Sequence, residues 1–349
     1  MTVDRIGRRA SSACVAALLA ACSQSATVPN TAPLVANDAT PTARADANGC
    51  PSKRCIVVTK QRGYGRKAAD AVLFFTEDAN GNKSPAGELS GSKTRLGFPT
   101  GLAMDSHHNL YVSNGYPASI TVYAAGAEGN VAPIRTIVGN KTQLNHPAGL
   151  AIDPQDELYV ANNQGTHYRI TVYAPDANGN VVPLREIHGN KTELYSPWGI
   201  AFDSQSKLYV ANDDPNTGWI TVYASGAKGN VTPERIIKGS ATKLAGPAGL
   251  AVDASGYIYV VDSMAEAVSI FGPGANGNEA PFSYFSAPIY ALGLALDKRG
   301  TMYVTSVGYD DPPYIAVFAG GPTRKARHLL RTIEGTKTKL NWPQGIIVR

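Results

Sequence analysis

The chain has 349 residues, of which 43% are apolar and 17% are charged, and its formal net charge is +5. This composition excludes a disordered protein, because it supplies enough apolar side chains for a core. The basic excess is small and has no long Lys/Arg run, so we expect no nucleic-acid partner. The 35 Gly, 23 Pro and 17 Tyr residues favour strands joined by turns.

The N-terminus has the pattern of an export signal. Three arginines precede an apolar run that is too short to span a bilayer and that ends in Leu-Ala-Ala-Cys at 19–22. This ending resembles the lipobox of bacterial lipoproteins. The resemblance implies that residues 1–21 are removed, that Cys22 is acylated, and that the lipid anchors the protein in the cell envelope. Ser23 stands where an Asp would signal inner-membrane retention, which favours the outer membrane.

Residues 22–49 are rich in Ala, Thr, Pro and Asn, and they are expected to form a flexible tether behind the lipidated Cys22. The folded domain is expected to span 50–349. Cys14 leaves with the signal, so Cys50 and Cys55 remain. Export makes a disulfide between these two plausible, and it would staple the start of the domain.

An internal repeat is the strongest feature of the sequence. The segment Pro-Ala-Gly-Leu-Ala-Ile-Asp at 147–153 recurs five times in closer or weaker form, with its glycine at Gly101, Gly149, Gly199, Gly249, Gly293 and Gly345. The intervals of 48, 50, 50, 44 and 52 residues between these positions indicate a propeller or solenoid array.

Each period contains four runs of the strand type. In the second copy, the runs are Gly149–Asp153 (strand a), Glu157–Ala161 (b), Arg169–Ala174 (c) and Leu184–His188 (d). They are short, rich in β-branched and aromatic residues, and bounded by turn residues. An Asn-Gly cassette between c and d, as in 176–180, predicts a tight hairpin there. Four strands per repeat are typical of a propeller blade.

The two ends of the array complement each other. The chain finishes after a lone strand a, Gly345–Arg349, and the domain begins with a lone b, c and d at 55–59, 71–76 and about 87–90. Five complete blades lie between them. We therefore predict an all-β, six-bladed propeller of four-stranded antiparallel blades, in which the C-terminal strand a joins the N-terminal three and closes the ring.

The repeat resembles the NHL-repeat β-propellers. The residues that carry the resemblance are Leu-Asn-His-Pro-Ala-Gly-Leu-Ala-Ile-Asp at 144–153, Leu-Tyr-Val-Ala-Asn at 158–162 and Arg-Ile-Thr-Val-Tyr at 169–173. The resemblance covers about 55–349 and implies the fold rather than a particular activity. It also implies that the start of strand a and the end of strand b share the face on which ligands bind.

Candidate site residues therefore lie at those two positions. Aromatic, amide and carboxylate side chains converge there, as they do in ligand sites, and we select His146, Asn163, Trp198, Asp213, Asp262, Tyr290 and Trp342 as the channel mouth. An Asn or Asp after a strand also commonly caps a turn. The Asp that ends each Gly-Leu-Ala-x-Asp unit recurs in five copies, which favours a turn role rather than a ligand role.

Three functions remain open. The first is a module that binds a small molecule, glycan or protein at the mouth, without a cofactor. The second is a metal-dependent enzyme, since gluconolactonase-like hydrolases and peptidylglycine lyases have a similar layout. Its metal, calcium rather than zinc, would be held by His146, Asn163, Asp213 and Asp262. The third is a scaffold that recruits proteins through its irregular b–c loops. We expect a monomer and no catalytic residues.

Overall fold

The structure is a computed structural model that describes residues 55–62, 69–165, 168–214, 217–288, 290–308, 311–321 and 328–349. The chain divides into two units, 1–42 and 43–349, and every described residue belongs to the second. Among the described residues, no helix has the length and apolar character of a membrane span.

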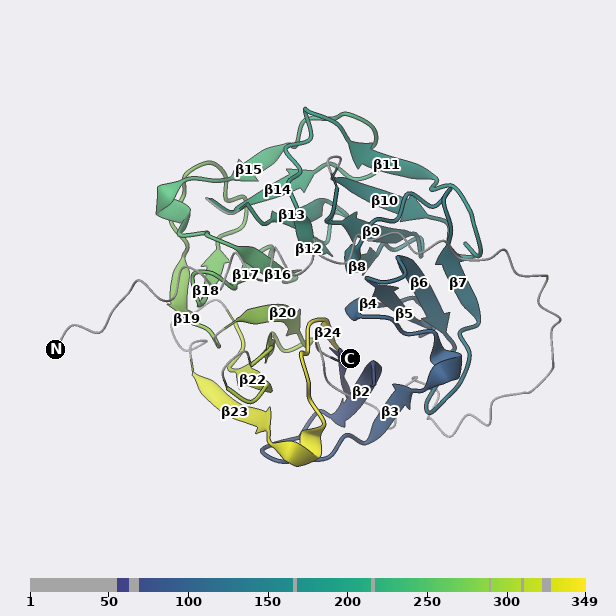
Figure 1. Ribbon diagram of the computed structural model, residues 1–349. Helices are drawn as coiled ribbons and strands as arrows, with labels where there is room; N and C mark the ends of the chain where they lie inside the picture. Colours follow the sequence, from purple (N-terminus) through teal and green to yellow (C-terminus); the bar gives the residue numbers. More distant parts are fainter. Residues whose placement is uncertain are drawn as a thin grey trace. The chain divides into compact units, whose positions relative to one another are not determined.

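Six four-stranded antiparallel sheets, here called blades I to VI, surround a central axis (Figure 1). Blade I contains β4 (Pro99–Met104), β5 (Leu110–Asn114), β6 (Ser119–Tyr123) and β7 (Arg135–Val138). Blade II contains β8 (Pro147–Ile152), β9 (Leu158–Asn162), β10 (Arg169–Tyr173) and β11 (Arg185–His188). Blade III contains β12 (Pro197–Phe202), β13 (Leu208–Asn212), β14 (Trp219–Tyr223) and β15 (Arg235–Ile237).

Blade IV contains β16 (Pro247–Val252), β17 (Ile258–Asp262), β18 (Ala267–Phe271) and β19 (Ser283–Ser286). Blade V contains β20 (Ala291–Leu296), β21 (Met302–Ser306), β22 (Tyr314–Phe318) and β23 (Leu329–Glu334). Blade VI contains β24 (Ile346–Val348), β1 (Cys55–Lys60), β2 (Ala71–Thr76) and β3 (Gly87–Ser90). Three 3₁₀ turns, η1 (Ser92–Thr94), η2 (Ser240–Thr242) and η4 (Thr336–Thr338), follow outer strands.

The predicted ring closure is confirmed. Strand β24 pairs antiparallel with β1, with Ile346 opposite Val58 and Val348 opposite Ile56. The backbone of Arg349 exchanges two hydrogen bonds with Cys55, at 3.1 and 3.2 Å. The last residues of the chain therefore complete the blade that the first described strands begin.

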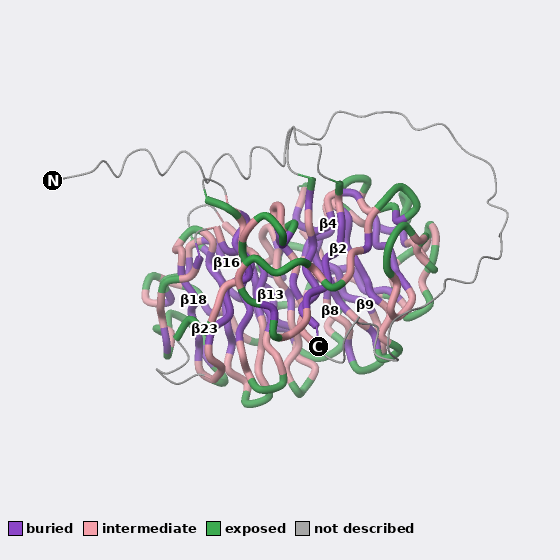
Figure 2. The backbone as a smooth tube through the Cα atoms, turned by 90° about the horizontal axis from the view of Figure 1, so that it is seen from below, coloured by how far each residue is buried: buried purple, intermediate pink, exposed green. Residues whose placement is uncertain are grey.

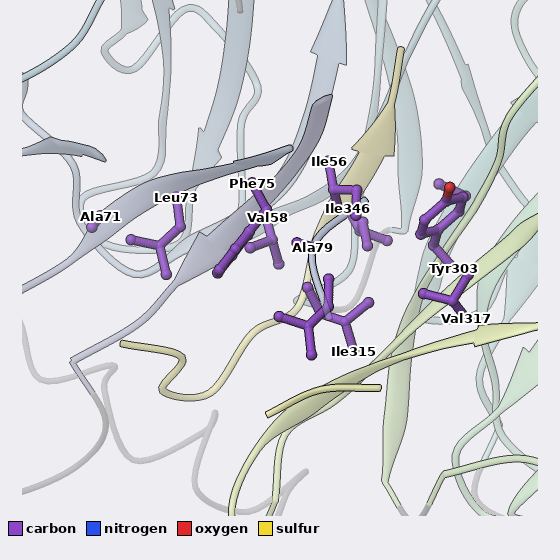
Figure 3. Close-up of a cluster of buried hydrophobic side chains, with 12 residues drawn as sticks. Ile56, Val58, Ala71, Leu73, Phe75, Ala79, Tyr303, Ile315, Val317 and Ile346 are labelled. Carbon is purple, nitrogen blue, oxygen red and sulfur yellow. The ribbon is translucent and has the colours of Figure 1, made fainter. Parts of the chain in front are cut away.

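The core lies between the blades. Six clusters of buried side chains each draw on two neighbouring blades, and the buried stretches follow the strands while exposed residues follow the loops (Figure 2). In the cluster between blades V and VI, Ile346 lies with Ile56 on one side and faces Tyr303 and Val317 on the other (Figure 3). The closing strand thus belongs to the apolar core, which is the main source of stability.

The repeated glycine of strand a has a packing reason. In every blade this glycine lies against the backbone carbonyl of the residue directly before the equivalent glycine in the next blade, as Gly199 does against Ala248 and Gly345 against Thr100. A Cβ at any of the six positions would overlap that carbonyl oxygen. The six contacts run once round the channel, so glycine is required wherever two innermost strands meet.

Strands c and d pair as expected, but the prediction of a tight turn between them is wrong. The cassette is a longer loop that leaves its own blade and reaches the outer strand of the preceding one. Gly179 of blade II donates a hydrogen bond to Thr136 of β7 (2.7 Å) and accepts one from Val138 (3.1 Å). The side chain of Asn180 then accepts a hydrogen bond from the backbone of Lys141. Only the glycine needs positive φ here, and the loop serves contacts between blades.

Candidate functional site

The start of strand a and the residue after strand b meet at one end of the ring, here called the strand-b rim. In five blades the N–H after strand b donates to the carbonyl of the residue before strand a. These bonds are Gly115 to Phe98 (3.1 Å), Asn163 to His146 (3.4 Å), Asp213 to Ser196 (3.4 Å), Ser263 to Gly246 (2.9 Å) and Val307 to Tyr290 (3.4 Å). Gln61 and Trp342 hold the equivalent positions in blade VI.

Large side chains stand before strand a in an unusual backbone conformation. Phe98, His146, Tyr290 and Trp342 all have positive φ, between 47° and 53°. This region costs an ordinary residue about 1 kcal/mol or more, and it is usually given to Gly or Asn. The conformation recurs around the ring, so it belongs to the fold. Its effect is to hold bulky, half-buried side chains at the rim.

His146 and Asn163 form a pair within blade II. The Nδ1 atom of His146 lies 2.8 Å from Oδ1 of Asn163. With the amide oriented in this way, Nδ1 carries the proton and Nε2 keeps its lone pair. The Nε2 atom faces Gly115 of blade I, where an added Cβ would lie 3.1 Å away. Burial lowers the pKa of His146, and the bond to Asn163 opposes this only in part. A neutral imidazole therefore presents a hydrogen-bond acceptor beside the rim.

Asp213 is the most unusual group on the rim. Burial, reinforced by the nearby carboxylates of Asp262 and Asp214, raises the pKa of Asp213 to about 6. Among the described residues, no donor lies within hydrogen-bonding distance of its carboxylate. A carboxylate without a partner in such a place costs folding free energy, and charged groups of this kind are common in functional sites.

Replacing Asp213 with Asn is expected to stabilise the protein at neutral pH. Below the unfolded pKa of 3.8 the carboxyl is neutral in both states, and it costs nothing. As the pH rises from 3.8 to about 6, the carboxyl ionises in the unfolded chain while the folded protein still holds the proton, so the free energy of unfolding falls, and the loss is complete above about 6. The variant should gain about 2 kcal/mol in free energy of unfolding at pH 7.5 and almost nothing at pH 4. Urea denaturation at both pH values measures this.

The matched control is Asp176→Asn, which changes an exposed carboxylate in an outer loop. It should give no gain that grows with pH. Equal effects of the two substitutions at pH 7.5, or a gain for Asp213→Asn that persists at pH 4, would contradict the assignment.

Asp262, predicted together with Asp213 as a carboxylate of the rim, has a different role. It is the last residue of β17, fully buried, and its carboxylate accepts hydrogen bonds from the backbone N–H groups of Ala245, Gly246, Met264 and Ala265, at 2.7 to 3.1 Å. Asn114, Asn162 and Asn212 hold the same place in blades I to III and also accept a backbone N–H. Asp262 therefore caps the neighbouring loops, and the rim residue lies one position further along.

The repeated Asp at the opposite end of the blades has the expected turn role. Asp153 accepts the N–H groups of Gln155 and Glu157, both at 2.9 Å. The same two bonds recur at Asp105, Asp203, Asp253 and Asp297. These carboxylates are used by the turns and lie away from the rim.

The remaining aromatic candidates lie where the pattern predicts. Trp198 is half-buried at the second position of β12, beside Ser196 and hence in the same blade as Asp213. Tyr290 and Trp342 precede the first strands of blades V and VI. Rim residues of blades II and III are thus consecutive around the ring, whereas Tyr290 and Trp342 belong to the two blades at the closure.

An aromatic cluster next to Asp213 was missed by the sequence analysis. The ring of Tyr168 in blade II lies tilted against the ring of Tyr195, with 5.0 Å between centroids, and Tyr195 contacts Trp219 at 6.1 Å between centroids. Burial raises the pKa of Tyr168 most, followed by Tyr195, and the nearby carboxylates of Asp214 and then Asp213 add to the rise. Trp219 itself is covered by Lys238, whose Nζ lies 3.6 Å from the ring centre. The sequence signal that could have revealed this cluster is that no other repeat has a Tyr at the positions equivalent to Tyr168 and Tyr195.

The described side chains do not form a metal site. Of the four predicted ligands, Asp262 already accepts four backbone donors, and His146 is paired with Asn163. Within the described ranges, no three His, Cys, Asp or Glu side chains are grouped closely enough to hold an ion. We therefore derive no step through a metal.

Two predicted sites lie wholly or partly outside the described residues. Cys22 and Cys50 are both outside, so lipidation stays a prediction. Cys55 is disulfide-bonded; because Cys50 lies outside the described residues, the predicted pairing with it stays a prediction.

No protein-family model and no curated protein matches this chain. Similar solved structures include a protein of unknown function from Bacteroides caccae, with a TM-score of 0.59 at 12% identity over 85% of this chain and 99% of that one. A candidate 6-phosphogluconolactonase from Bacteroides uniformis gives 0.54 at 12% identity over 85% and 100%. A functionally unknown protein from Desulfotomaculum acetoxidans gives 0.52 at 12% identity over 81% and 80%. What this chain shares with them is the fold.

Proposed function

We propose that the protein is a lipid-anchored, NHL-like propeller of the bacterial cell envelope that binds a small polar ligand at the strand-b rim. The supporting observation is the carboxylate of Asp213 at the rim, which has no hydrogen-bond partner among the described residues. Its burial raises its pKa, so the ionised group lowers the stability of the folded protein. Residues that weaken a fold without a structural return are commonly kept for function. The neighbouring His146–Asn163 pair adds an acceptor and an amide group.

Variation around the ring supports the same location. Positions that serve the blade are uniform, such as the glycine of strand a and the Asp of the a–b turn. The residue after strand b is instead different in every blade, being Gln61, Gly115, Asn163, Asp213, Ser263 and Val307. A position that varies between blades is not required for packing within the blade, so its side chain is available to recognise a ligand.

Charge at the rim favours a ligand that carries an amine. Asp213 and Asp214 lie together in blade III, whereas Arg62 is paired with Asp70, with 3.8 Å between Nε and Oδ2. An anionic ligand would meet the carboxylates, while an ammonium group would neutralise Asp213 and relieve the cost of its burial. Half-buried Trp198 supplies an apolar face in the same blade, suited to a sugar or aromatic ring.

Glucosamine, glucose and glucuronate form a matched set of probes for the proposed site. They differ chiefly in charge, so isothermal titration should give the strongest binding for glucosamine and the weakest for glucuronate. Asp213→Asn should reduce the preference for glucosamine over glucose about tenfold, the factor that follows from 1.4 kcal/mol. Binding that is absent for all three, or that ignores Asp213, would contradict the proposal.

Alanine at Trp198 and Trp342 is expected to weaken binding of the best probe without unfolding the ring, because both side chains are only half-buried. The loss should be about tenfold or more for a stacking contact. Trp219→Phe is the control, since Lys238 covers that ring. Unchanged binding in both alanine variants, with thermal melts showing folded protein, would remove the two tryptophans from the site.

Lipidation at Cys22 makes a separate prediction. Several acyl chains anchor a protein firmly, at about 0.8 kcal/mol per buried CH₂ group. Cys22→Ser should therefore move the protein from the membrane fraction, where we expect it in the outer membrane, to the soluble fraction. Cys14→Ser, inside the signal, is the control and should change nothing. Membrane retention of the Cys22 variant would show that no lipid holds the protein there.

The metal-dependent enzyme is the weaker hypothesis. The likeness to a candidate 6-phosphogluconolactonase extends to the fold alone at 12% identity, and the described rim does not assemble the ligands of a divalent ion. Lactone hydrolysis by the purified protein that depends on stoichiometric calcium would favour this hypothesis over simple binding.

A further inference from the structure

The loop between strands c and d fastens neighbouring blades, and we call this contact the clasp. At each clasp a glycine of one blade bridges to the outer strand of the preceding blade: Gly81 to Ile333, Gly129 to Leu89, Gly179 to Ile137, Gly229 to Ile187 and Gly277 to Ile237. Each glycine N–H donates to the residue before the bridged one and each glycine carbonyl accepts from the residue after it. An Asn after the glycine accepts a further backbone N–H. Five outer strands are covered in this way.

The sixth outer strand, β19, has no clasp among the described residues. In blade V the c–d connection continues as a hairpin instead: Phe318 pairs with Leu329, and Ala319 donates to the carbonyl of His328 at 2.9 Å. Because the two strands stay paired beyond their usual ends, the described part of the connection runs along blade V itself. The groups on β19 that match the clasped ones elsewhere are the carbonyl of Tyr284 and the N–H of Ser286, and Ser286 is exposed.

The chain carries one more copy of the clasp sequence. Asp-Ala-Asn-Gly occurs at 78–81 and 176–179, where its glycine makes the two clasp bonds, and again at 46–49, ahead of the first blade. The Ala of this motif is buried in the 78–81 copy. Cys50 stands where the structural copies have Asn, so this copy has the residue types for the two backbone bonds and lacks the one for the side-chain bond.

We propose that Asp46–Gly49 of a second copy of this chain forms on β19 the clasp that no described residue supplies. The segment cannot reach β19 of its own ring. Five residues separate Gly49 from Cys55, which allows at most about 21 Å. Strand β1 lies in blade VI, and β19 is the outermost strand of blade IV. With strands ~4.8 Å and packed sheets ~10 Å apart, the two strands are about 30 Å apart, with blade V between them.

The contact has the chemistry of strand addition to an exposed sheet edge. An open edge with unpaired N–H and C=O groups is a standing template for another chain, and natural proteins usually cover it. A membrane surface would favour the contact further, because anchored molecules share a thin layer and so have a high effective concentration. The inference is independent of the rim ligand, since β19 is the outermost strand of its blade and the rim lies at the innermost strands.

The experiment removes the donor and the acceptor separately in the full-length lipidated protein, held in detergent. Replacing 46–49 by Ser-Gly-Ser-Gly removes the clasp segment, and Ser286→Pro removes the N–H of β19 that would donate to the clasp. The same replacement at 36–39 is the matched control. Sedimentation equilibrium should be followed up to about 0.2 mM, because a few hydrogen bonds give only micromolar to millimolar affinity.

We expect association in the parent and the control, at least tenfold weaker association in each single variant, and recovery when the two variants are mixed, since one then supplies the clasp and the other the edge. The recovery also shows that each variant is folded. Monomers throughout, association that neither change weakens, or variants that fail to complement each other would overturn the proposal.

Discussion

Replacing Gly199 with alanine is expected to be among the most damaging single substitutions in the chain. The new methyl group would overlap the carbonyl oxygen of Ala248 and press tightly against the backbone nitrogen of Leu250, both in the innermost strand of blade IV. Backbone cannot move aside as a flexible side chain does, and each innermost strand is held by two neighbours. We expect a loss of about 3 kcal/mol or more in free energy of unfolding. Urea denaturation followed by tyrosine and tryptophan fluorescence measures it.

Gly272→Ala is the matched control. Gly272 follows β18, its φ is not positive, and an added Cβ would meet nothing within 4 Å. Its substitution should change stability by less than about 0.5 kcal/mol. If Gly199→Ala were as mild as this control, the innermost strands could not be packed as closely as the structure shows, and the repeated glycine would need another explanation.

The architecture could be predicted from the sequence because the same four-strand pattern recurs in each repeat. The incomplete ends, strand a at 345–349 and strands b to d at 55–90, predicted the ring closure that β24 and β1 confirm. It was insufficient for contacts between blades. The Asn-Gly cassette has the composition of a hairpin turn, and nothing local shows that Gly179 bonds to the preceding blade. A turn signal describes its own loop and carries no information about a neighbouring sheet.

The candidate site was predictable only to within one position of each strand end. Asp213 and Asp262 both looked like carboxylates at the exit of strand b. Asp262 lies one position earlier and accepts four backbone N–H groups from a loop, whereas Asp213 has no such donor among the described residues. The Tyr168–Tyr195 contact could not be predicted for a related reason, since it joins the start of a strand c to the loop before the next blade.

Removing Gly345–Arg349 is expected to have the largest effect of any change considered, because it opens the ring. The deletion takes away three residue pairs with β1, the two backbone bonds between Cys55 and Arg349, and the buried side chain of Ile346. Ile346 alone is worth about 3 kcal/mol, and the lost bonds add about 1 kcal/mol each. The innermost edge of β1, with Val57 and Val58 in it, would then be exposed, and such an edge promotes association. Deletion of 33–37, also five residues but outside every described strand, should leave the melt unchanged.

The measurement is a pair of observations on the truncated protein. Its thermal transition should fall by well over 10 °C, which is the scale set by a loss of several kcal/mol in a domain of this size. Light scattering should show more association than in the parent at the same protein concentration, because the edge of β1 is exposed only in the truncated protein. Ring closure by the C-terminal strand is what places blade VI, and with it Trp342, beside blades I and V. A truncated protein that melted like the parent and scattered no more light would mean that blade VI is held by something other than β24, and the arrangement of the rim around that blade would have to be rebuilt.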